Sequence, residues 1–452
     1  MLIKIIVDNF KSFNHPTELN MIASNRLKDE LGHKIELKNV QVLKNAVIYG
    51  ANASGKSNLV EIFEFLRTAL IDGISIESKY MFCKCDKKNI NKESTFEIQF
   101  SVNDHIYDYG FSVLLNQSCV KQEWLYELKS TNFNCIFESN YQEIPKLGIT
   151  NIDSKDRIRF DTYASDYVGN SDVLFLSELN RGKKYDKKSK LYVLKEVFDW
   201  LTKNIIVYKP RLPITNFEYF YDSSSLDVVN DLIRAFDTGI SSARIENITT
   251  DELKNKLPPT LFEAVIERIK KGAGDKNKRT RFSMRSTDDF FSIEIGENQE
   301  PIITTIKLKH EKSFYDFDFE EESDGTRRIF DLLDMILIKE NDIVFVVDEL
   351  ERSLHPKLTQ HFLELFNQIH ANRRIQLVFT THESSIMDQS LFRRDEIWFI
   401  ERNCDSTSKI YSLDRFKERY DKKLSKSYLE GRYGAIPIFK IYDFMEDKNG
   451  AF

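Results

Sequence analysis

The sequence predicts an α/β protein in which a mixed sheet is joined to an antiparallel subdomain and a mostly helical insertion. Three observations support this: an apolar run at 46–49 leads through a glycine-rich loop into a helix, the run 343–347 is wholly apolar, and residues 95–113 alternate with period two. With 452 residues, 41% of them apolar, the chain can form one large or two ordinary domains.

Composition disfavours a globally basic nucleic-acid-binding protein, a disulfide-stabilised protein and a membrane-spanning protein. The 65 Lys and Arg residues against 71 Asp and Glu residues give a net charge of −6, so no global basic field attracts nucleic acid or an anionic membrane. The five cysteines are scattered and odd in number, which favours reduced thiols in the cytoplasm. Cys83-Lys84-Cys85 is interpreted as structural rather than as half of a metal site. No apolar run approaches the ~18 residues of a membrane span, so we expect a cytoplasmic protein.

The loop at residues 50–57 carries the strongest motif. It reads Gly-Ala-Asn-Ala-Ser-Gly-Lys-Ser, which fits the P-loop pattern G-x-x-x-x-G-K-[ST] between a strand and a helix. Backbone amides of such a loop cradle phosphate, Lys56 reaches the β- and γ-phosphate oxygens, and the Ser57 hydroxyl takes a Mg²⁺ position. We therefore expect ATP to be bound by Gly50, Asn52, Ala53, Ser54, Gly55, Lys56, Ser57 and Asn58.

The middle of the chain is less regular. Residues 95–113 predict an antiparallel hairpin, and further strands are expected to about residue 137. Helices are expected near 189–203, 224–238 and 259–271, without the sustained heptads of a long coiled coil. The basic segment from Arg268 to Arg281 is either a solvated loop, which we favour, or a contact to a phosphate backbone. The predicted organisation is an N-terminal lobe, an insertion, a C-terminal lobe and a tail, at 1–140, 141–304, 305–415 and 416–452.

Residues 314–320 alternate aromatic and acidic side chains, which predicts a half-buried strand. Within it Asp316 and Asp318 have the D-x-D spacing of some two-metal nucleases. On alternate positions of an amphipathic strand, the simpler interpretation is that both carboxylates face water.

The second half of the expected nucleotide site follows. Residues 323–326, Ser-Asp-Gly-Thr, open an apolar helix and offer a second anion site at its N-terminus, although alone this would be a helix cap. Asp348 ends the apolar strand, where a carboxylate can hold Mg²⁺ through water, and Glu349 can polarise the attacking water. After a helix from about Pro356 to His370 and a strand at 375–380, His382 can hydrogen-bond the γ-phosphate or the catalytic water.

In this order the motifs resemble those of the ATP-binding-cassette (ABC) ATPases of the SMC and RecF type, which implies an ABC-type P-loop NTPase head. The family's names for them are Walker A (50–57), signature (323–326), Walker B (348–349), D-loop (353–356) and H-loop (382), and residues 9–13, Asn-Phe-Lys-Ser-Phe, also look like the family's. The resemblance covers about 1–110 and 305–415. It implies that Ser323, Gly325 and Thr326 of one copy complete the ATP site of another, so hydrolysis requires a homodimer or a larger homo-oligomer.

The signature departs from the commoner serine-glycine-glycine form, because Asp324 precedes Gly325. In this it is similar to OLD-type and related defence ATPases. The glutamine loop is not identified, and Gln99 and Gln122 are candidates.

The C-terminal region resembles one branch of these ATPases. Residues 393–402 look like the strand after the histidine loop in OLD-type ATPases, and residues 428–439 resemble the tail of the RloA- and AbiL-type ATPases of phage-defence and abortive-infection systems. That resemblance implies a separate effector protein, possibly a Toprim-like nuclease. Physically, the tail could cover a sheet edge, which we favour, or dock a partner.

Together these features predict a Mg²⁺-dependent ATPase with Lys56, Glu349 and His382 as catalytic residues, acting as sensor or scaffold of a phage-defence system. The alternative is a RecF- or SMC-like DNA-repair ATPase that clamps DNA. A third hypothesis is that the chain is itself a nuclease that uses Asp316 and Asp318.

Overall fold

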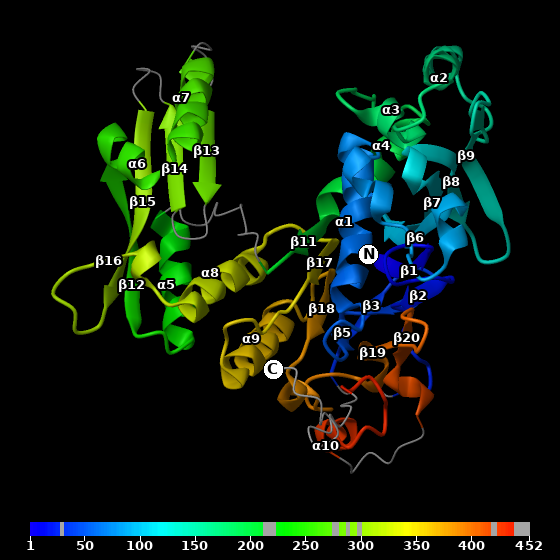
Figure 1. Ribbon diagram of the computed structural model, residues 1–452. Helices are drawn as coiled ribbons and strands as arrows, with labels where there is room; N and C mark the ends of the chain where they lie inside the picture. The colour runs from blue at the N-terminus through cyan, green and yellow to red at the C-terminus, as the bar shows by residue number, and fades with distance from the viewer. Residues whose placement is uncertain are drawn as a thin grey trace, which may run out of the picture. The chain divides into compact units, whose positions relative to one another are not determined.

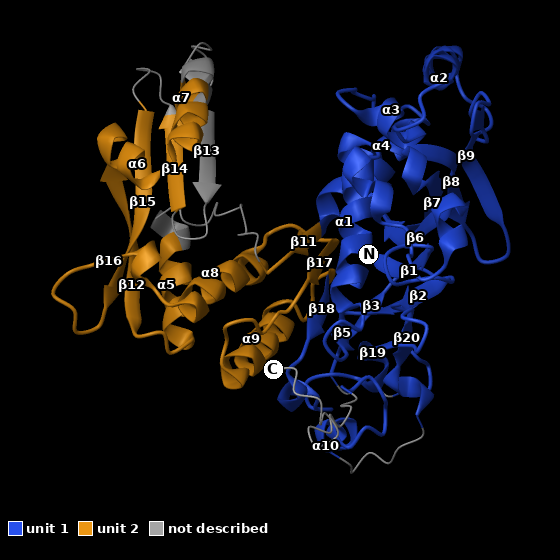
Figure 2. Ribbon diagram, in the orientation of Figure 1, with its two compact units in different colours: residues 1–205, 376–452 blue, residues 206–375 orange. Residues whose placement is uncertain are grey.

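The computed structural model describes residues 1–27, 31–210, 223–273, 280–285, 290–295, 301–416 and 423–437. These residues form two compact units, drawn in different colours in Figure 2: unit 1 contains residues 1–205 and 376–452, and unit 2 contains residues 206–375. Each unit is described by itself. Among the described helices, none is both long and apolar enough to cross a membrane. The four-segment organisation expected from the sequence stays a prediction.

Unit 1 contains an antiparallel sheet with the strand order β10-β9-β8-β7-β6-β1-β2 (Figure 1). The predicted hairpin is confirmed, because β6 and β7 pair from Ser94↔Val113 to Val102↔His105. The two residues between them, Asn103 and Asp104, both have positive φ, as a tight hairpin turn with right-handed strand twist requires. The strands are β1 (Leu2–Asp8), β2 (Thr17–Asn20), β6 (Ser94–Val102), β7 (His105–Leu114), β8 (Cys119–Leu128), β9 (Phe133–Asn140) and β10 (Lys146–Leu147).

A buried carboxyl group ties this sheet to the helices beside it. Glu123 of β8 is 1% exposed and accepts hydrogen bonds from the Tyr109 hydroxyl at 2.9 Å and from the amides of Phe175 and Leu176 at 2.5 and 3.0 Å. Those amides begin α3, so the carboxyl group fixes the helix to the sheet. The helices here are α2 (Ser154–Tyr167), α3 (Phe175–Asn180) and α4 (Tyr192–Asp199), and a π-helical turn (Trp200–Asn204) extends α4.

The second sheet of unit 1 has the strand order β18-β5-β19-β20. The strand β5 is wholly buried and pairs in parallel with β18 and β19, whereas β20 pairs with β19 antiparallel. The predicted fold class, α/β with a mixed sheet and an antiparallel subdomain, is thus confirmed. The elements are β5 (Asn45–Tyr49), β18 (Ile375–Thr381), β19 (Ile397–Arg402), β20 (Ser408–Ser412) and the helix α1 (Lys56–Asp72) that follows β5; a two-stranded sheet of β3 (Lys34–Glu36) and β4 (Gln41–Leu43) precedes them.

The described part of the C-terminal tail packs on this second sheet. Tyr428, in the short helix α10 (Leu424–Leu429), stacks on Phe399 of β19 with ring centroids 5.6 Å apart and lies 5.6 Å from the Tyr49 ring of β5. The Tyr411 hydroxyl of β20 donates to the Tyr433 carbonyl at 2.7 Å. The tail therefore packs within the unit through aromatic contacts, while residues 438–452 lie outside the described residues.

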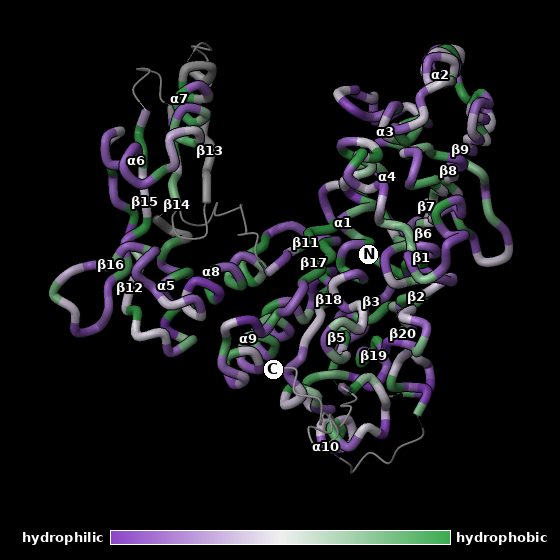
Figure 3. Tube along the Cα trace, viewed as in Figure 1, coloured by the Kyte–Doolittle hydropathy of each residue, from purple (hydrophilic) through white to green (hydrophobic). Residues whose placement is uncertain are grey.

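Unit 2 contains the strand predicted to end in the Walker B acids. This strand, β17 (Ile343–Val347), is buried at every residue, and it is drawn in the apolar colour along its length in Figure 3. It neighbours β11 (Ile205–Tyr208). Two helices flank it in sequence, α8 (Asp324–Leu337) and α9 (Pro356–Ile369). The helix α9 confirms the one predicted at about 356–370.

Unit 2 also contains an antiparallel sheet that the interpretation of 141–304 as mostly helical did not include. Its strand order is β12-β15-β14-β13, and α6 and α7 pack an apolar cluster on it that includes Leu253, Val265 and Phe291. Residues 141–304 thus hold helices on two different sheets. The elements are α5 (Ser223–Ala235), β12 (Ile240–Ile248), α6 (Thr250–Lys256), α7 (Pro259–Ala273), β13 (Thr280–Arg285), β14 (Phe290–Ile295) and β15 (Pro301–His310).

The strand predicted over 314–320 is wrong for most of its length. Only β16 (Phe317–Asp318) is a strand, and Phe314 and Tyr315 are 95% and 84% exposed in the turn before it. Asp318 ends the strand because it forms a capping box with Glu321 that starts a 3-10 turn. The aromatic residues at alternate positions therefore do not all face a core.

Candidate functional site

The sheet of unit 1 explains why the P-loop and the H-loop histidine lie together. In the register of the parallel strands, Tyr49 at the end of β5 pairs with Thr381 at the end of β18. The carboxyl ends of parallel strands lie at one edge of a sheet, so the segments that follow both residues emerge side by side. His382 follows directly after Thr381 and is thereby placed beside the P-loop.

The P-loop has the backbone of an anion nest. Ala53 has φ of 58° and Gly55 has φ of 112°, so the loop turns its amides inward before α1 starts at Lys56. No side chain of the described residues caps the N-terminus of α1, and its first turn holds no acidic residue. The amides of this turn and the positive end of the helix are thus available to an anion such as phosphate.

Lys56 and His382 meet at this loop. Lys56 is 6% exposed, and its Nζ donates to the carbonyl oxygens of Gly50 at 2.8 Å and Ala51 at 3.1 Å. The same Nζ lies 3.4 Å from Nδ1 of His382. The hydroxyl oxygen of Ser54 is buried without a hydrogen-bond partner among the described residues. A buried cation and an unsatisfied hydroxyl inside a ring of backbone amides fit a bound phosphate group.

The remaining predicted ligands of unit 1 lie on the same loop or in the first turn of α1. Asn52, Ala53 and Ser57 are exposed, so their atoms are accessible to a ligand. Asn58 is half-buried and donates from Nδ2 to the Ser12 hydroxyl oxygen at 2.7 Å. Asn58 thus contacts the segment at 9–13 rather than pointing freely to solvent.

In unit 2 the two Walker B acids differ in exposure. Asp348 is 6% exposed, and its amide donates to the Tyr208 carbonyl at 2.9 Å, which extends the pairing of β17 with β11 by one residue. Glu349 is half-buried and has φ of 50°, a left-handed conformation that is costly for a residue with a side chain. Arg328 of α8 donates to the Glu349 carbonyl at 3.3 Å. Strain at a carboxylate of this kind is typical of functional sites.

The signature residues begin α8 and touch the D-loop. Ser323 is the N-cap, its hydroxyl accepting from the Thr326 amide at 3.1 Å. Gly325 lies so close to the D-loop that a Cβ on it would stand 2.7 Å from the Ser353 carbonyl oxygen. Ser323 is exposed and Gly325 is half-buried, whereas Thr326 is buried. Signature and D-loop are therefore in direct contact within unit 2.

The glutamine-loop candidates and the D-x-D acids belong neither to the P-loop site of unit 1 nor to the Walker B and signature residues of unit 2. Gln99 lies within β6 and donates to Asp108 Oδ2 at 2.7 Å, and Gln122 lies within β8, so both are strand residues. Asp316 is ion-paired with Arg244 at 2.5 Å.

Asp318 is likewise paired with basic side chains, lying 2.8 Å from Lys307 and 3.4 Å from Lys256. Burial opposes its charge, but these two lysines outweigh it and hold the pKa of Asp318 below its ordinary value. Lysine and arginine contacts favour a structural role for the D-x-D acids. Within the described ranges, no cluster of three or more His, Cys, Asp or Glu residues is placed to hold a metal. The basic side chains of the segment from Arg268 to Arg281 lie outside the described residues.

Sequence reasoning missed Ser408 and the function of Ser12. Ser408 of β20 hydrogen-bonds the P-loop from a position 354 residues away in the chain. Nothing in its local sequence indicates this contact, because it depends on β20 pairing beside β19. Ser12 belongs to the segment at 9–13, which resembles that of the ABC ATPases, so the sequence does carry a signal at this position.

Comparison with known proteins establishes the family. Residues 46–388 match the family model described as "AAA domain, putative AbiEii toxin, Type IV TA system". The chain belongs to this AAA-domain family. The match spans the P-loop, the signature, the Walker B acids and the H-loop. Members are P-loop ATPase domains, which implies nucleotide binding, and the description links the AAA-domain family to toxin–antitoxin systems.

Solved structures give a more distant likeness. The chain is 14% identical to the structure titled "Crystal structure of the SmcHead bound to the C-winged helix domain of ScpA", over 91% of this chain and 97% of that chain, with a TM-score of 0.43. It is 12% identical to the "SMC head domain from Thermotoga maritima", over 91% of this chain and 98% of that chain, with a TM-score of 0.35. No curated protein matches the sequence.

Proposed function

We propose that the protein is a Mg²⁺-dependent ATPase that oligomerises around ATP and serves as sensor or scaffold of an anti-phage abortive-infection system. The observation that carries this proposal is the arrangement of Lys56, whose Nζ lies on the carbonyl oxygens of its own P-loop and 3.4 Å from His382. A phosphate group is the ligand that this cation, the surrounding amides and the adjacent imidazole suit together.

The roles of the residues follow from their chemistry. Lys56 binds the β- and γ-phosphate oxygens, and His382 hydrogen-bonds the γ-phosphate. The oxygen donors of Ser57 and Asp348 are those that Mg²⁺ prefers, and both are suited to hold it; the ion neutralises phosphate charge when bound. Glu349 polarises the attacking water, and its left-handed backbone sets the direction of the carboxylate.

The signature residues have no ATP-binding role within their own copy in this proposal. Ser323, Gly325 and Thr326 of one copy contact the ATP bound to another, so the ATPase functions as a homodimer or a larger homo-oligomer. The exposure of Ser323 at the N-terminus of α8 supports this, since its backbone and the helix dipole can face a second copy's γ-phosphate. A separate effector protein, possibly a Toprim-like nuclease, then carries the toxic activity in the cytoplasm.

Two variants test the ATPase. Lys56→Ala should abolish nucleotide binding, because it removes the cation of the nest, while Glu349→Gln should retain ATP binding and trap the ATP-bound oligomer with turnover reduced at least a hundredfold. Lys129→Ala and Glu364→Gln change exposed residues outside both motifs and serve as matched controls. Full turnover by both active-site variants would refute the assignment.

Native mass spectrometry of the protein purified from its source, with ATP and Mg²⁺ present, tests the biological role. A stoichiometric second protein on an even-numbered assembly is the expected result. A partner-free dimer whose turnover is stimulated by DNA in a steeply salt-dependent way would instead favour the RecF- or SMC-like DNA clamp.

A further inference from the structure

A chain of hydrogen bonds runs beneath the P-loop and joins three parts of unit 1. Asn58 Nδ2 lies 2.7 Å from the Ser12 hydroxyl oxygen, which lies 2.7 Å from the hydroxyl oxygen of Ser408. That hydroxyl lies 2.5 Å from the carbonyl oxygen of Ser54, within the P-loop. The backbone reinforces the chain, because the Ser408 amide donates to the Ser12 carbonyl at 2.7 Å. The P-loop, β20 and the segment at 9–13 are thus bonded together.

Only one direction of donation satisfies every group in this chain. The Asn58 amide nitrogen can only donate and the Ser54 carbonyl can only accept, while each hydroxyl has a single proton to give. Ser12 must therefore donate to Ser408, and Ser408 must donate to the carbonyl. Removing either hydroxyl breaks the sequence of donors. Since Ser408 is 6% exposed, water has little room to replace it.

The same two hydroxyls lie against Gly55. This residue has φ of 112°, and a Cβ placed on it would stand 2.4 Å from the Ser408 hydroxyl oxygen and 2.8 Å from that of Ser12. The two hydroxyls therefore occupy the space beside the left-handed Gly55 that a side chain would fill, and Ser408 also bonds the Ser54 carbonyl. Both contacts act on the backbone whose amides form the anion nest.

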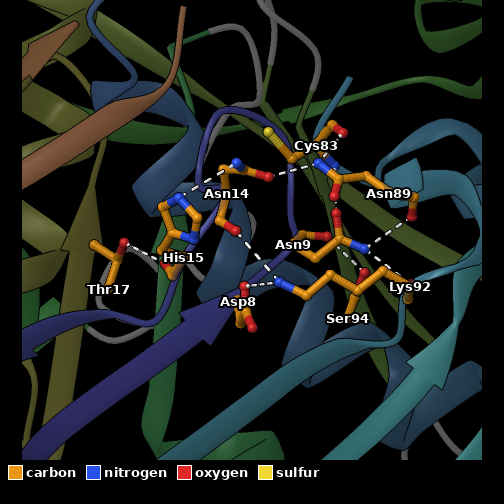
Figure 4. A network of polar contacts seen from close by, with 9 residues as sticks. All are labelled: Asp8, Asn9, Asn14, His15, Thr17, Cys83, Asn89, Lys92 and Ser94. Carbon is orange, nitrogen blue, oxygen red and sulfur yellow. Dashed lines mark hydrogen bonds and ion pairs between the residues drawn. The ribbon is translucent and has the colours of Figure 1, made fainter. Parts of the chain in front are cut away.

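The position of Ser12 is fixed independently of the P-loop. Figure 4 shows the network around Asn9, which is fully buried and has φ of 52°. Its Nδ2 donates to the carbonyls of Asn89 at 3.0 Å and Lys92 at 2.8 Å, and its Oδ1 accepts from the Cys83 amide at 3.2 Å. The segment at 9–13 is thus anchored to a different part of the unit, so Ser12 gives the P-loop a fixed support.

We propose that Ser12 and Ser408 are positioning residues that hold the P-loop in its phosphate-binding conformation before the nucleotide arrives. Neither belongs to the P-loop motif, and both act through the backbone of Ser54 and Gly55. A loop that is already ordered loses less conformational freedom on binding, so the support strengthens nucleotide affinity. The chemical step depends on other residues and is unchanged. This inference rests on the proposed nucleotide binding.

The test compares Ser12→Ala, Ser408→Ala and the double variant with Ser412→Ala. Ser412 lies on the same strand as Ser408 but bonds the Asp414 amide at 3.1 Å, so it controls for removing a hydroxyl from β20. Calorimetric titration with Mg-ADP, well below the unfolding temperature, should give a Kd about tenfold higher for each single variant, the contribution of about one hydrogen bond. The double variant should have the same Kd for Mg-ADP as the single variants, because the chain of hydrogen bonds acts as a unit. Turnover at saturating ATP should stay within about twofold of wild type.

The outcomes separate this inference from the proposed function. Failure of the wild-type protein to bind Mg-ADP and Mg-ATP would refute the proposed function itself. Wild-type binding together with an unchanged Kd in both single variants would overturn only the role of the serines. A lower melting temperature with an unchanged Kd would also overturn it, since that result shows a purely structural contribution. A tenfold loss of affinity in the serine variants, absent from Ser412→Ala, would establish the inference.

Discussion

Replacing Glu123 with glutamine tests which of two opposing effects sets the charge of a fully buried carboxyl group. Burial disfavours the carboxylate, whereas the donors from Phe175, Leu176 and Tyr109 favour it, and burial prevails, raising the pKa of Glu123 from 4.5 to about 7. Because the folded-state pKa lies above the unfolded one, the folded state binds more protons in this interval. The group's contribution to stability is complete below pH 4.5 and is lost as the pH rises through 7.

The size of the effect follows from the shift. One pKa unit corresponds to about 1.4 kcal/mol, so the free energy of unfolding should lose roughly 2–3 kcal/mol through this group between pH 5 and pH 8. Glu123→Gln cannot titrate, and its amide group sets two donors face to face at a cost of about 1–3 kcal/mol. The stability advantage of wild type over the variant should therefore be larger at pH 5 than at pH 8, by the same roughly 2–3 kcal/mol.

Urea unfolding at several pH values measures this difference. Tryptophan fluorescence is a suitable probe, because all three tryptophans, Trp124, Trp200 and Trp398, belong to unit 1 with Glu123. Burial also raises the pKa of Glu97, to about 7, but that group is present in both proteins and cancels in the difference. A wild-type advantage that is equal at pH 5 and pH 8 would refute the reasoning, since it would mean that the three donors keep the carboxylate charged.

Two further predictions concern unit 2 and the tail. Gly325→Ala should lower the free energy of unfolding by up to about 2 kcal/mol, because a helix gains up to about 1 kcal/mol from alanine while overlap with the Ser353 carbonyl, 2.7 Å from the new Cβ, costs about 1–3 kcal/mol. Its steady-state ATP turnover, measured well below the unfolding temperature, should also fall at least tenfold as α8 moves off the D-loop, and wild-type turnover would contradict this. Tyr428→Ala should destabilise unit 1 by about 3–5 kcal/mol through lost packing on Phe399, whereas Tyr428→Phe should cost only about 1 kcal/mol in chemical denaturation. Equal losses in the two Tyr428 variants would show that the hydroxyl, not the ring, holds the tail.

The parts of the site that were predictable are those coded by contiguous residues. The P-loop, the strand at 343–347 and the hairpin at 95–113 each combine a local pattern with flanking turn residues, and all three exist in the structure. The nearness of His382 to Lys56 also follows from local signals, because His382 comes directly after the buried strand β18 and the P-loop that leads to Lys56 comes directly after the parallel strand β5.

The parts that were missed depend on contacts between distant residues. The sheet of unit 2 pairs β12 with β15, as in Ile245↔Ile306, across about sixty residues of sequence. Its strand β14 does alternate apolar and polar residues, FFSIEI, a local signal that the helical interpretation of 141–304 overlooked. The short β16 ends where Asp318 and Glu321 form a capping box, and this starts a 3-10 turn where the alternating aromatic and acidic residues predict a longer strand. Ser408 lies 396 residues from Ser12, and no local propensity encodes a hydrogen bond of that separation.

The segment from the second Walker B acid to the start of the D-loop, residues 349–353, shows what a screen for thermostable variants would select. Glu349 has φ of 50° and Ser353 has φ of 63°, and each left-handed non-glycine residue stores roughly 1 kcal/mol of backbone strain. Glycine at either position would relieve that strain, so selection for heat resistance alone would favour it. Under the proposed function, glycine at 349 would remove the carboxylate that polarises water. Directed evolution for stability would therefore have to leave residue 349 unchanged, because glycine there stabilises the fold but removes the catalytic carboxylate. Glycine at residue 353 would instead show how far the backbone strain can be reduced before ATP turnover falls.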